Sequence, residues 1–408
     1  MRTVTRVAPL LVAALISSTV VAQKKDEKAP KPPQVSKQIL KPLIAAQEAS
    51  KKEQWADCVA KIKEVEAFEN RTPYDNYVLN DILGFCALRT GDNPLAISAW
   101  SQVVESEFAD AARASSLRKG LLQLSYQGKD YVKAVQYGRK LIEMGTADEA
   151  VYLLTIQSYY LQNDFKGSEK LAVDYITSLE QKAQTPPDLS LQLYASSCIK
   201  QDNDICTMNA LEKQAKYFPK KETWPNLSLL LFRSGGEANT LNIFRIARDA
   251  GGLTRGEEYT EMAQLSIEKG LPGEAQSTIE EGQAKGLYSV KATQDLANRL
   301  LATAKAQAAA DKPTLIKQDI EAAGKKNGEV DARIALAFMS YGDYEKAAAA
   351  FERGLAKGNV RNPEETKLNL GISQLKAGKK DAAVATLSSV QGDDTLRRLA
   401  RLWTQRAR

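Results

Sequence analysis

The chain of 408 residues contains no histidine, and this absence excludes more functions than any motif that is present. Histidine is the commonest general base, the usual partner of Ser and Cys nucleophiles, and a frequent ligand of zinc and iron. A Walker loop, a CxxC pair and a GxSxG elbow are also missing from the sequence. We therefore predict that the protein is not an enzyme and that it binds no cofactor and no metal. An enzyme working through Ser, Asp or Glu alone is the alternative.

Long apolar runs are scarce as well, and the one that stands out lies at the start of the chain. Arg2 and Arg6 precede the apolar run 7–21, and small residues end it at Ala22. A basic start, an apolar middle too short to span a bilayer and a small-residue end are typical of a cleavable secretory signal. We predict a signal peptide over residues 1–22, with a retained anchor helix as the alternative.

The segment after the predicted signal has a different composition. Residues 23–34 are rich in Lys and Pro, which predicts a disordered spacer. No later stretch is apolar enough to cross a membrane. We therefore expect a periplasmic protein with no integral membrane span once the signal is removed.

Positive charge is in modest excess and is concentrated only at the end of the chain. The formal net charge is +6, and the one basic cluster is the tail over residues 397–408. Nucleic-acid binding needs a basic patch interleaved with aromatic residues, and the sequence has none. We predict no nucleic-acid partner and interpret residues 393–408 as a basic helix that caps the open end of the fold. Contact of this tail with anionic lipid or an acidic partner is the alternative.

The sequence has only four cysteines, and they form two pairs by position. Cys58 and Cys86 lie at similar distances from a predicted turn between two helices, and Cys198 and Cys206 flank another turn. An even number of cysteines in an oxidising compartment favours two local disulfides. The alternative is that each cysteine is a small buried side chain.

What the chain does have is a repeated two-helix pattern, clearest over residues 331–358. A small residue lies in each helix, and Gly342-Asp343 makes the turn between them. This pattern resembles the tetratricopeptide (TPR) repeat. The close-packing position of the first helix recurs at intervals of 33 to 39 residues. It lies at Gly84, Leu122, Ile156, Ala195, Ser228, Ala263, Ala297, Ala335 and Gly371.

Because one hairpin cannot bury its own apolar face, such units must stack on their neighbours. We predict an all-α fold, a TPR-like α-solenoid (a superhelix of antiparallel helical hairpins). It should occupy residues 35–392 as an N-terminal hairpin followed by about nine repeats. The repeat from Ala297 to Gly324 has no Gly-Asp turn and should be irregular.

In a TPR array the first helices line a concave groove, and certain positions of each first helix face into it. Amides at those positions suit the backbone of an extended peptide, and aromatic residues are common anchors of interfaces. The candidate groove residues are Phe85, Lys119, Gln123, Tyr126, Gln157, Tyr160, Gln192, Phe232, Gln264 and Asn298. The alternative is that the aromatic residues pack between hairpins and the amides are merely exposed.

The order of segments is also similar to that of bacterial periplasmic TPR proteins assigned to TonB energy-transduction systems. The similar segments are residues 35–62, 75–100, 224–241, 250–287 and 357–387. The resemblance implies an all-helical superhelix and a role beside the TonB–ExbB–ExbD motor, with TonB-system components as protein partners. It implies no catalytic residue. An adaptor for cell-envelope assembly or export, serving outer-membrane protein or polysaccharide machinery, is the alternative function.

Overall fold

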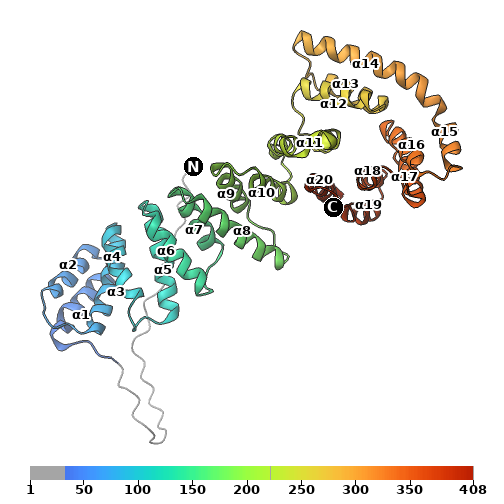
Figure 1. Cartoon of the computed structure of the whole chain (residues 1–408). Helices are drawn as coiled ribbons and strands as arrows, with labels where there is room; N and C mark the ends of the chain where they lie inside the picture. The colour runs from blue at the N-terminus through green and yellow to red at the C-terminus, as the bar shows by residue number, and fades with distance from the viewer. Residues whose placement is uncertain (1–32, 221, 408) are drawn as a thin grey trace, which may run out of the picture. The chain divides into compact units, whose positions relative to one another are not determined.

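The computed structural model describes residues 33–220 and 222–407 (Figure 1). The predicted signal peptide and most of the predicted spacer lie outside these described residues. Throughout the described ranges the regular structure is helical, and no strand occurs. The all-α prediction is therefore confirmed. The described residues form two compact units, the N-terminal unit up to residue 114 and the C-terminal unit from residue 115, and we describe each separately.

The N-terminal unit contains two helical hairpins. Its helices are α1 (Lys37–Lys51), α2 (Trp55–Glu66), α3 (Pro73–Thr90) and α4 (Asn93–Val104), and α5 (Ala111–Gln127) begins at its end. Helix α1 packs against α2, α2 against α3, and α3 against α4. At the close-packing position, a Cβ built on Gly84 would lie 2.3 Å from Cδ1 of Trp100 on α4. Only glycine allows the two helices of this hairpin to approach so closely.

The C-terminal unit continues the same arrangement. Its helices are α6 (Tyr131–Glu143), α7 (Glu149–Leu161), α8 (Phe165–Gln181), α9 (Asp188–Lys200), α10 (Asp204–Tyr217), α11 (Thr223–Asp249), α12 (Gly256–Glu268), α13 (Pro272–Ala284), α14 (Lys291–Asp311), the 3-10 helix η1 (Lys312–Thr314), α15 (Leu315–Ala323), α16 (Gly328–Ser340), α17 (Tyr344–Lys357), α18 (Pro363–Lys376), α19 (Lys380–Ser388) and α20 (Asp394–Ala407). Neighbouring helices pack antiparallel in hairpins, which gives the TPR-like architecture expected from the repeat.

The turn inside each hairpin has a common structure even where the sequence pattern is weak. One residue adopts a left-handed φ, and the residue after it, often Asp or Asn, is the N-cap of the second helix. Gly91 and Gly342 have the expected glycine at φ 80° and 77°. Lys129 and Asn163 adopt φ 62° and 65° in the degenerate repeats. Because non-glycine residues take the strained position there, the Gly-Asp signature is lost from the sequence while the turn is kept.

The range of α11 contains a whole hairpin. Gly236 interrupts its helical backbone with φ 63° and ψ 169°, so the two halves of α11 are the two helices of one repeat. The repeat predicted to be irregular, residues 297–324, covers most of α14 together with η1 and α15. Helix α14 packs against α12 and α13, whereas α15 packs against α16. Within the described residues, none of these helices is long and apolar enough to cross a membrane.

The last helix, α20, contacts both ends of the C-terminal half of the chain. It packs on α18 and α19, as a capping helix would, and also on α10 and α11 (Figure 1). Leu399 and Trp403 are almost fully buried in these contacts. Arg398 of α20 donates to Asn209 of α10 at 3.0 Å and pairs with the buried carboxylate of Glu212. The last helix of the described chain therefore contacts α10 and α11, which lie far before it in the sequence.

Candidate functional sites

The amides of the candidate groove are best exposed on the first helices of the C-terminal unit. Gln123 on α5 is exposed and Gln157 on α7 is half-buried. Neither side chain makes a hydrogen bond to any described residue. Their neighbours Leu122 and Val151 belong to one buried cluster, so the two helices share a core. These amides are the free polar groups that an extended peptide could use.

The other candidate amides already have partners. Gln192 of α9 donates to Asp188 at 3.0 Å, and Gln264 of α12 donates to Glu268 at 3.1 Å, both within one helix. Asn298 of α14 accepts from Gln283 of α13 at 3.4 Å. All three candidates are exposed. Because α7 packs directly against α9, Gln157 and Gln192 stand on adjacent first helices.

The candidate tyrosines are half-buried against aromatic residues of their own hairpins. The ring of Tyr126 lies 5.8 Å from that of Tyr131, and the ring of Tyr160 lies 5.2 Å from that of Phe165. Tyr131 and Phe165 are the first residues of α6 and α8. Each tyrosine thus supports the turn of its hairpin and leaves only part of its surface for a partner.

The two candidate phenylalanines are also engaged in packing. Phe232 lies 4.6 Å from Phe244 in the second half of α11, measured between ring centroids. Phe85 belongs to the N-terminal unit, where its ring meets Trp55 at 5.6 Å and Arg89 stacks over the same indole. Both phenylalanines are half-buried, and they lie in different units of the chain.

Lys119 is held by an ion pair. Its ammonium lies 2.7 Å from Asp148, which also caps α7 by accepting from the backbone N–H of Val151 at 3.1 Å. The hydrogen bond from Lys119 holds the pKa of Asp148 below its ordinary value. The lysine therefore ties α5 to the start of α7, and it is not a free charge for a ligand.

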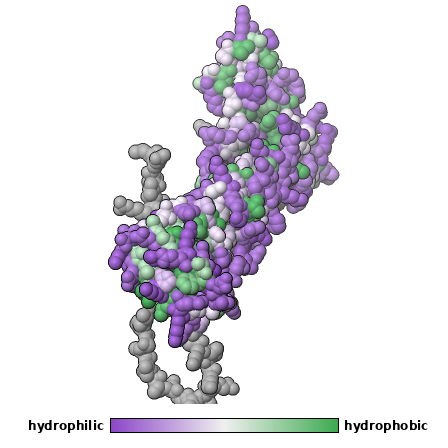
Figure 2. All heavy atoms as spheres, turned by 90° about the vertical axis from the view of Figure 1, so that its left-hand side faces the viewer, coloured by the Kyte–Doolittle hydropathy of each residue, from purple (hydrophilic) through white to green (hydrophobic). Residues whose placement is uncertain are grey.

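Exposed apolar side chains occur on the first helices too. Ile199 of α9 is 57% exposed and Leu229 in the first half of α11 is 50% exposed. In the N-terminal unit, Leu40 and Ile44 lie one turn apart on α1, each 46% exposed. Figure 2 faces that unit and shows apolar residues in small areas among hydrophilic ones.

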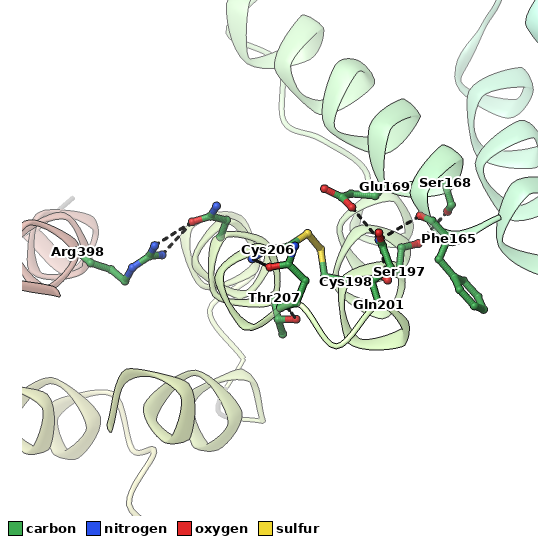
Figure 3. Close-up of a disulfide and its surroundings, with 11 residues drawn as sticks. Phe165, Ser168, Glu169, Ser197, Cys198, Gln201, Cys206, Thr207 and Arg398 are labelled. Carbon is green, nitrogen blue, oxygen red and sulfur yellow. Dashed lines mark hydrogen bonds between the residues drawn. A yellow bond between two sulfur atoms is a disulfide. The ribbon is translucent and has the colours of Figure 1, made fainter. Parts of the chain in front are cut away.

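The four cysteines are joined in two local pairs. Cys58 bonds to Cys86 with a Cα–Cα distance of 6.2 Å, and Cys198 bonds to Cys206 with a distance of 5.4 Å. Figure 3 shows the second bridge between α9 and α10, with Glu169 on one side. Donor atoms of Glu169 and the two cysteines lie within 4.8 Å, but both sulfurs are bonded to each other. This leaves Glu169 as a single ligand, which cannot hold a metal ion by itself.

The structure also contains a partly open site that the sequence patterns do not predict. A cavity of about 620 Å³ lies inside the C-terminal unit, and we call it the inner cavity. Its walls come from α11, α12, α13, α16, α18 and α20, with Lys312 of η1 and the turn at Tyr341 completing them. Second helices contribute much of the wall, whereas the predicted groove used first helices only. Charged residues within the apolar segment 241–249 were the one signal that could have pointed to it.

A nearly buried ion pair forms one wall of the inner cavity. Arg245 of α11 makes two hydrogen bonds of 2.8 Å to Glu274 of α13, and the two side chains are 6% and 12% exposed. Arg245 also donates to Asn242 at 3.0 Å and to Asn369 of α18 at 3.1 Å. Burial opposes the charge of Arg245, but Glu274 outweighs it and raises the pKa of the guanidinium. One arginine thereby joins three elements around the cavity.

Comparisons with known proteins add the following findings. No family model and no curated protein sequence matches the chain. Among solved structures, the chain is similar to a tetratricopeptide repeat protein from Parabacteroides merdae, with 11% identity and a TM-score of 0.31. That match covers 66% of this chain and all of the other.

Two further solved structures show a comparable likeness. The C-terminal part of a TPR repeat-containing protein from Cytophaga hutchinsonii is 15% identical, with a TM-score of 0.28, over 79% of this chain and 98% of that one. The apo form of RapI is 15% identical, with a TM-score of 0.31, over 79% of this chain and 88% of that one. Because these identities and TM-scores are low, the TPR-like assignment depends on the helical hairpins of this chain itself.

Proposed function

We propose that the protein is a non-enzymatic scaffold that binds extended peptide segments of protein partners. The observation that carries this proposal is the pair of free amides, Gln123 and Gln157, on first helices that share a core. An extended peptide presents an N–H and a C=O at every residue, and an amide side chain can satisfy both. The exposed Ile199 and Leu229 add apolar area on the first helices of later repeats.

We further propose that the protein acts in the periplasm as an accessory to a TonB–ExbB–ExbD system. The signal-like start of the sequence and the two disulfides support export to an oxidising compartment. The similarity of segment order to TonB-associated TPR proteins supports the choice of partner. TonB-type linkers are rich in proline and extended, which suits a groove that reads the backbone of an extended chain. An adaptor for envelope assembly or export stays the second candidate, because its partners would also present extended segments.

The test is a binding titration with purified periplasmic segments of TonB and ExbD. We expect the chain from residue 23 onward to bind one of them, and the double variant Gln123→Ala, Gln157→Ala to bind at least about tenfold more weakly. The matched control is Gln136→Ala, Gln181→Ala, which removes two exposed amides from the second helices α6 and α8. Equal loss in both double variants would contradict the groove. Absence of binding to both segments would redirect the proposal to envelope-assembly partners.

A further inference from the structure

We propose that the inner cavity binds a small organic monocarboxylate with an apolar body. This site is distinct from the proposed peptide groove at Gln123 and Gln157, since all of its walls come from α11 and later elements. Its volume of about 620 Å³ is in the range of small-molecule sites.

The walls of the cavity are joined by contacts between parts of the chain that are far apart in sequence. Asn242 donates to Glu365 across 123 positions at 2.9 Å, and Ser340 accepts from the backbone N–H of Glu274 at 2.9 Å. Asp249 pairs with both Lys376 of α18 and Arg406 of α20. Polar contacts of this kind fix the walls in place, so the cavity exists before any ligand arrives.

Each carboxylate on the cavity wall is already neutralised by a neighbouring cation. Glu274 pairs with Arg245 at 2.8 Å and Glu280 pairs with Lys305 at 3.2 Å. Glu281 pairs with Arg248 at 2.7 Å and with Lys285 at 2.6 Å. The remaining wall carboxylate, Asp249, has the two partners described above. No wall carboxylate is left to attract a cationic ligand.

In contrast, one cation and one hydroxyl on the wall have no polar partner. Lys312 makes no ion pair with any described residue, and its ammonium lies 5.6 Å above the ring of Tyr341. The hydroxyl of Tyr344 makes no hydrogen bond within the described part of the chain. Both groups line the inner cavity and are donors that an anion could use. A single free cation matches a singly charged carboxylate and is too little charge for a phosphate dianion.

One part of the wall favours an apolar body on the ligand. Tyr341, Tyr344, Met339, Ile372 and Trp403 all line the cavity. Tyr341 is oriented by a hydrogen bond of 2.8 Å to Asp311. Its ring therefore presents a fixed face beside Lys312, where an aromatic or aliphatic acid would place its body.

The experiment compares three probes of one shape by calorimetric or NMR titration of the full chain. The probes are benzoate, neutral benzamide and benzylammonium. We expect benzoate to bind about tenfold more tightly than benzamide, and benzylammonium to bind most weakly. Lys312→Gln should abolish the preference for benzoate over benzamide, and Tyr344→Phe should reduce it.

The matched control is Lys326→Gln, which removes an exposed lysine that does not line the cavity. We expect this variant to bind benzoate like the parent chain. Unchanged circular dichroism and melting of the Lys312 variant would show that it folds, since Lys312 is exposed. The proposal is overturned if benzoate fails to bind, if benzoate and benzamide bind equally, or if the two lysine variants behave alike.

Discussion

Arg245 and Glu274 form a bidentate ion pair, with both hydrogen bonds 2.8 Å long, between α11 and α13 of the C-terminal unit. The pair lies 29 positions apart in sequence and is almost entirely removed from solvent. Planar guanidinium and carboxylate groups match in this geometry, so the pair fixes the relative rotation of the two helices. Because Arg245 also reaches Asn369, the same pair holds α18 against the inner cavity.

We therefore expect Glu274→Gln to destabilise the C-terminal unit by about 3 kcal/mol, because it leaves a buried guanidinium without its counter-charge. Urea unfolding, with hydrogen exchange of α11 as a local probe, would measure the loss. Lys170→Gln breaks an exposed ion pair with Asp174 and should cost less than about 1 kcal/mol. Similar costs for the two variants would contradict the importance assigned to the buried pair.

Close packing between helices gives a second prediction. A Cβ on Gly371 would lie 2.5 Å from Cγ of Leu387, just as one on Gly84 would meet Trp100. We expect Gly371→Ala and Gly84→Ala to destabilise their units by about 1–3 kcal/mol through overpacking. Gly324→Ala is the control, since the nearest atom to its Cβ is 3.7 Å away. Melting temperatures of the three variants would test this prediction. Unchanged melting temperatures for Gly371→Ala and Gly84→Ala would show that the two helices of each hairpin separate easily.

The two disulfides should differ in their effect on stability. The bridge between Cys58 and Cys86 closes a loop of 28 residues, and the bridge between Cys198 and Cys206 closes one of 8. In the chain-entropy model their loss costs roughly 3.6 and 2.5 kcal/mol. We expect Cys58→Ala, Cys86→Ala to lower the free energy of unfolding more than Cys198→Ala, Cys206→Ala. Denaturant unfolding of both double variants would measure this, and the reverse order would show that the effect of the bridges is not entropic.

Protonation of Asp75 gives a prediction for acid stability. The buried carboxylate accepts from the backbone N–H and the hydroxyl of Ser36, at 2.9 and 2.6 Å, and from the N–H of Thr72. Burial would raise the pKa of Asp75, but the hydrogen bonds from Ser36 and Thr72 outweigh it and lower the pKa below 3.8.

Because the folded pKa is depressed, the stabilisation by Asp75 is present above pH 3.8 and is lost as the pH falls through the folded pKa. We expect Asp75→Asn to be less stable than the parent chain at neutral pH. The difference in stability should shrink as the pH falls below the folded pKa of Asp75. Melting curves across this pH range would test it. A stability difference that stays constant down to the lowest pH would contradict the assigned linkage.

Much of the local structure could be predicted from the sequence because each hairpin repeats at a short period. The positions inferred for Gly84 and Gly371 are close contacts in the structure, and the irregular repeat near α14 was visible as a missing Gly-Asp turn. The turns at Lys129 and Asn163 were harder to place, because the residues that adopt the left-handed φ there are not glycine. The roles of the groove residues stay predictions, since no partner defines them.

The sequence by itself determined the all-helical hairpins, because apolar periodicity and turn chemistry act over a few residues. Only the tertiary structure decided which hairpins meet at a distance. Arg398 reaches Glu212 across 186 positions, and Arg245 reaches Asn369 across 124. No local pattern encodes such pairs, since they depend on curvature accumulated over many repeats. The inner cavity is a product of that accumulated curvature and of the contacts that close it.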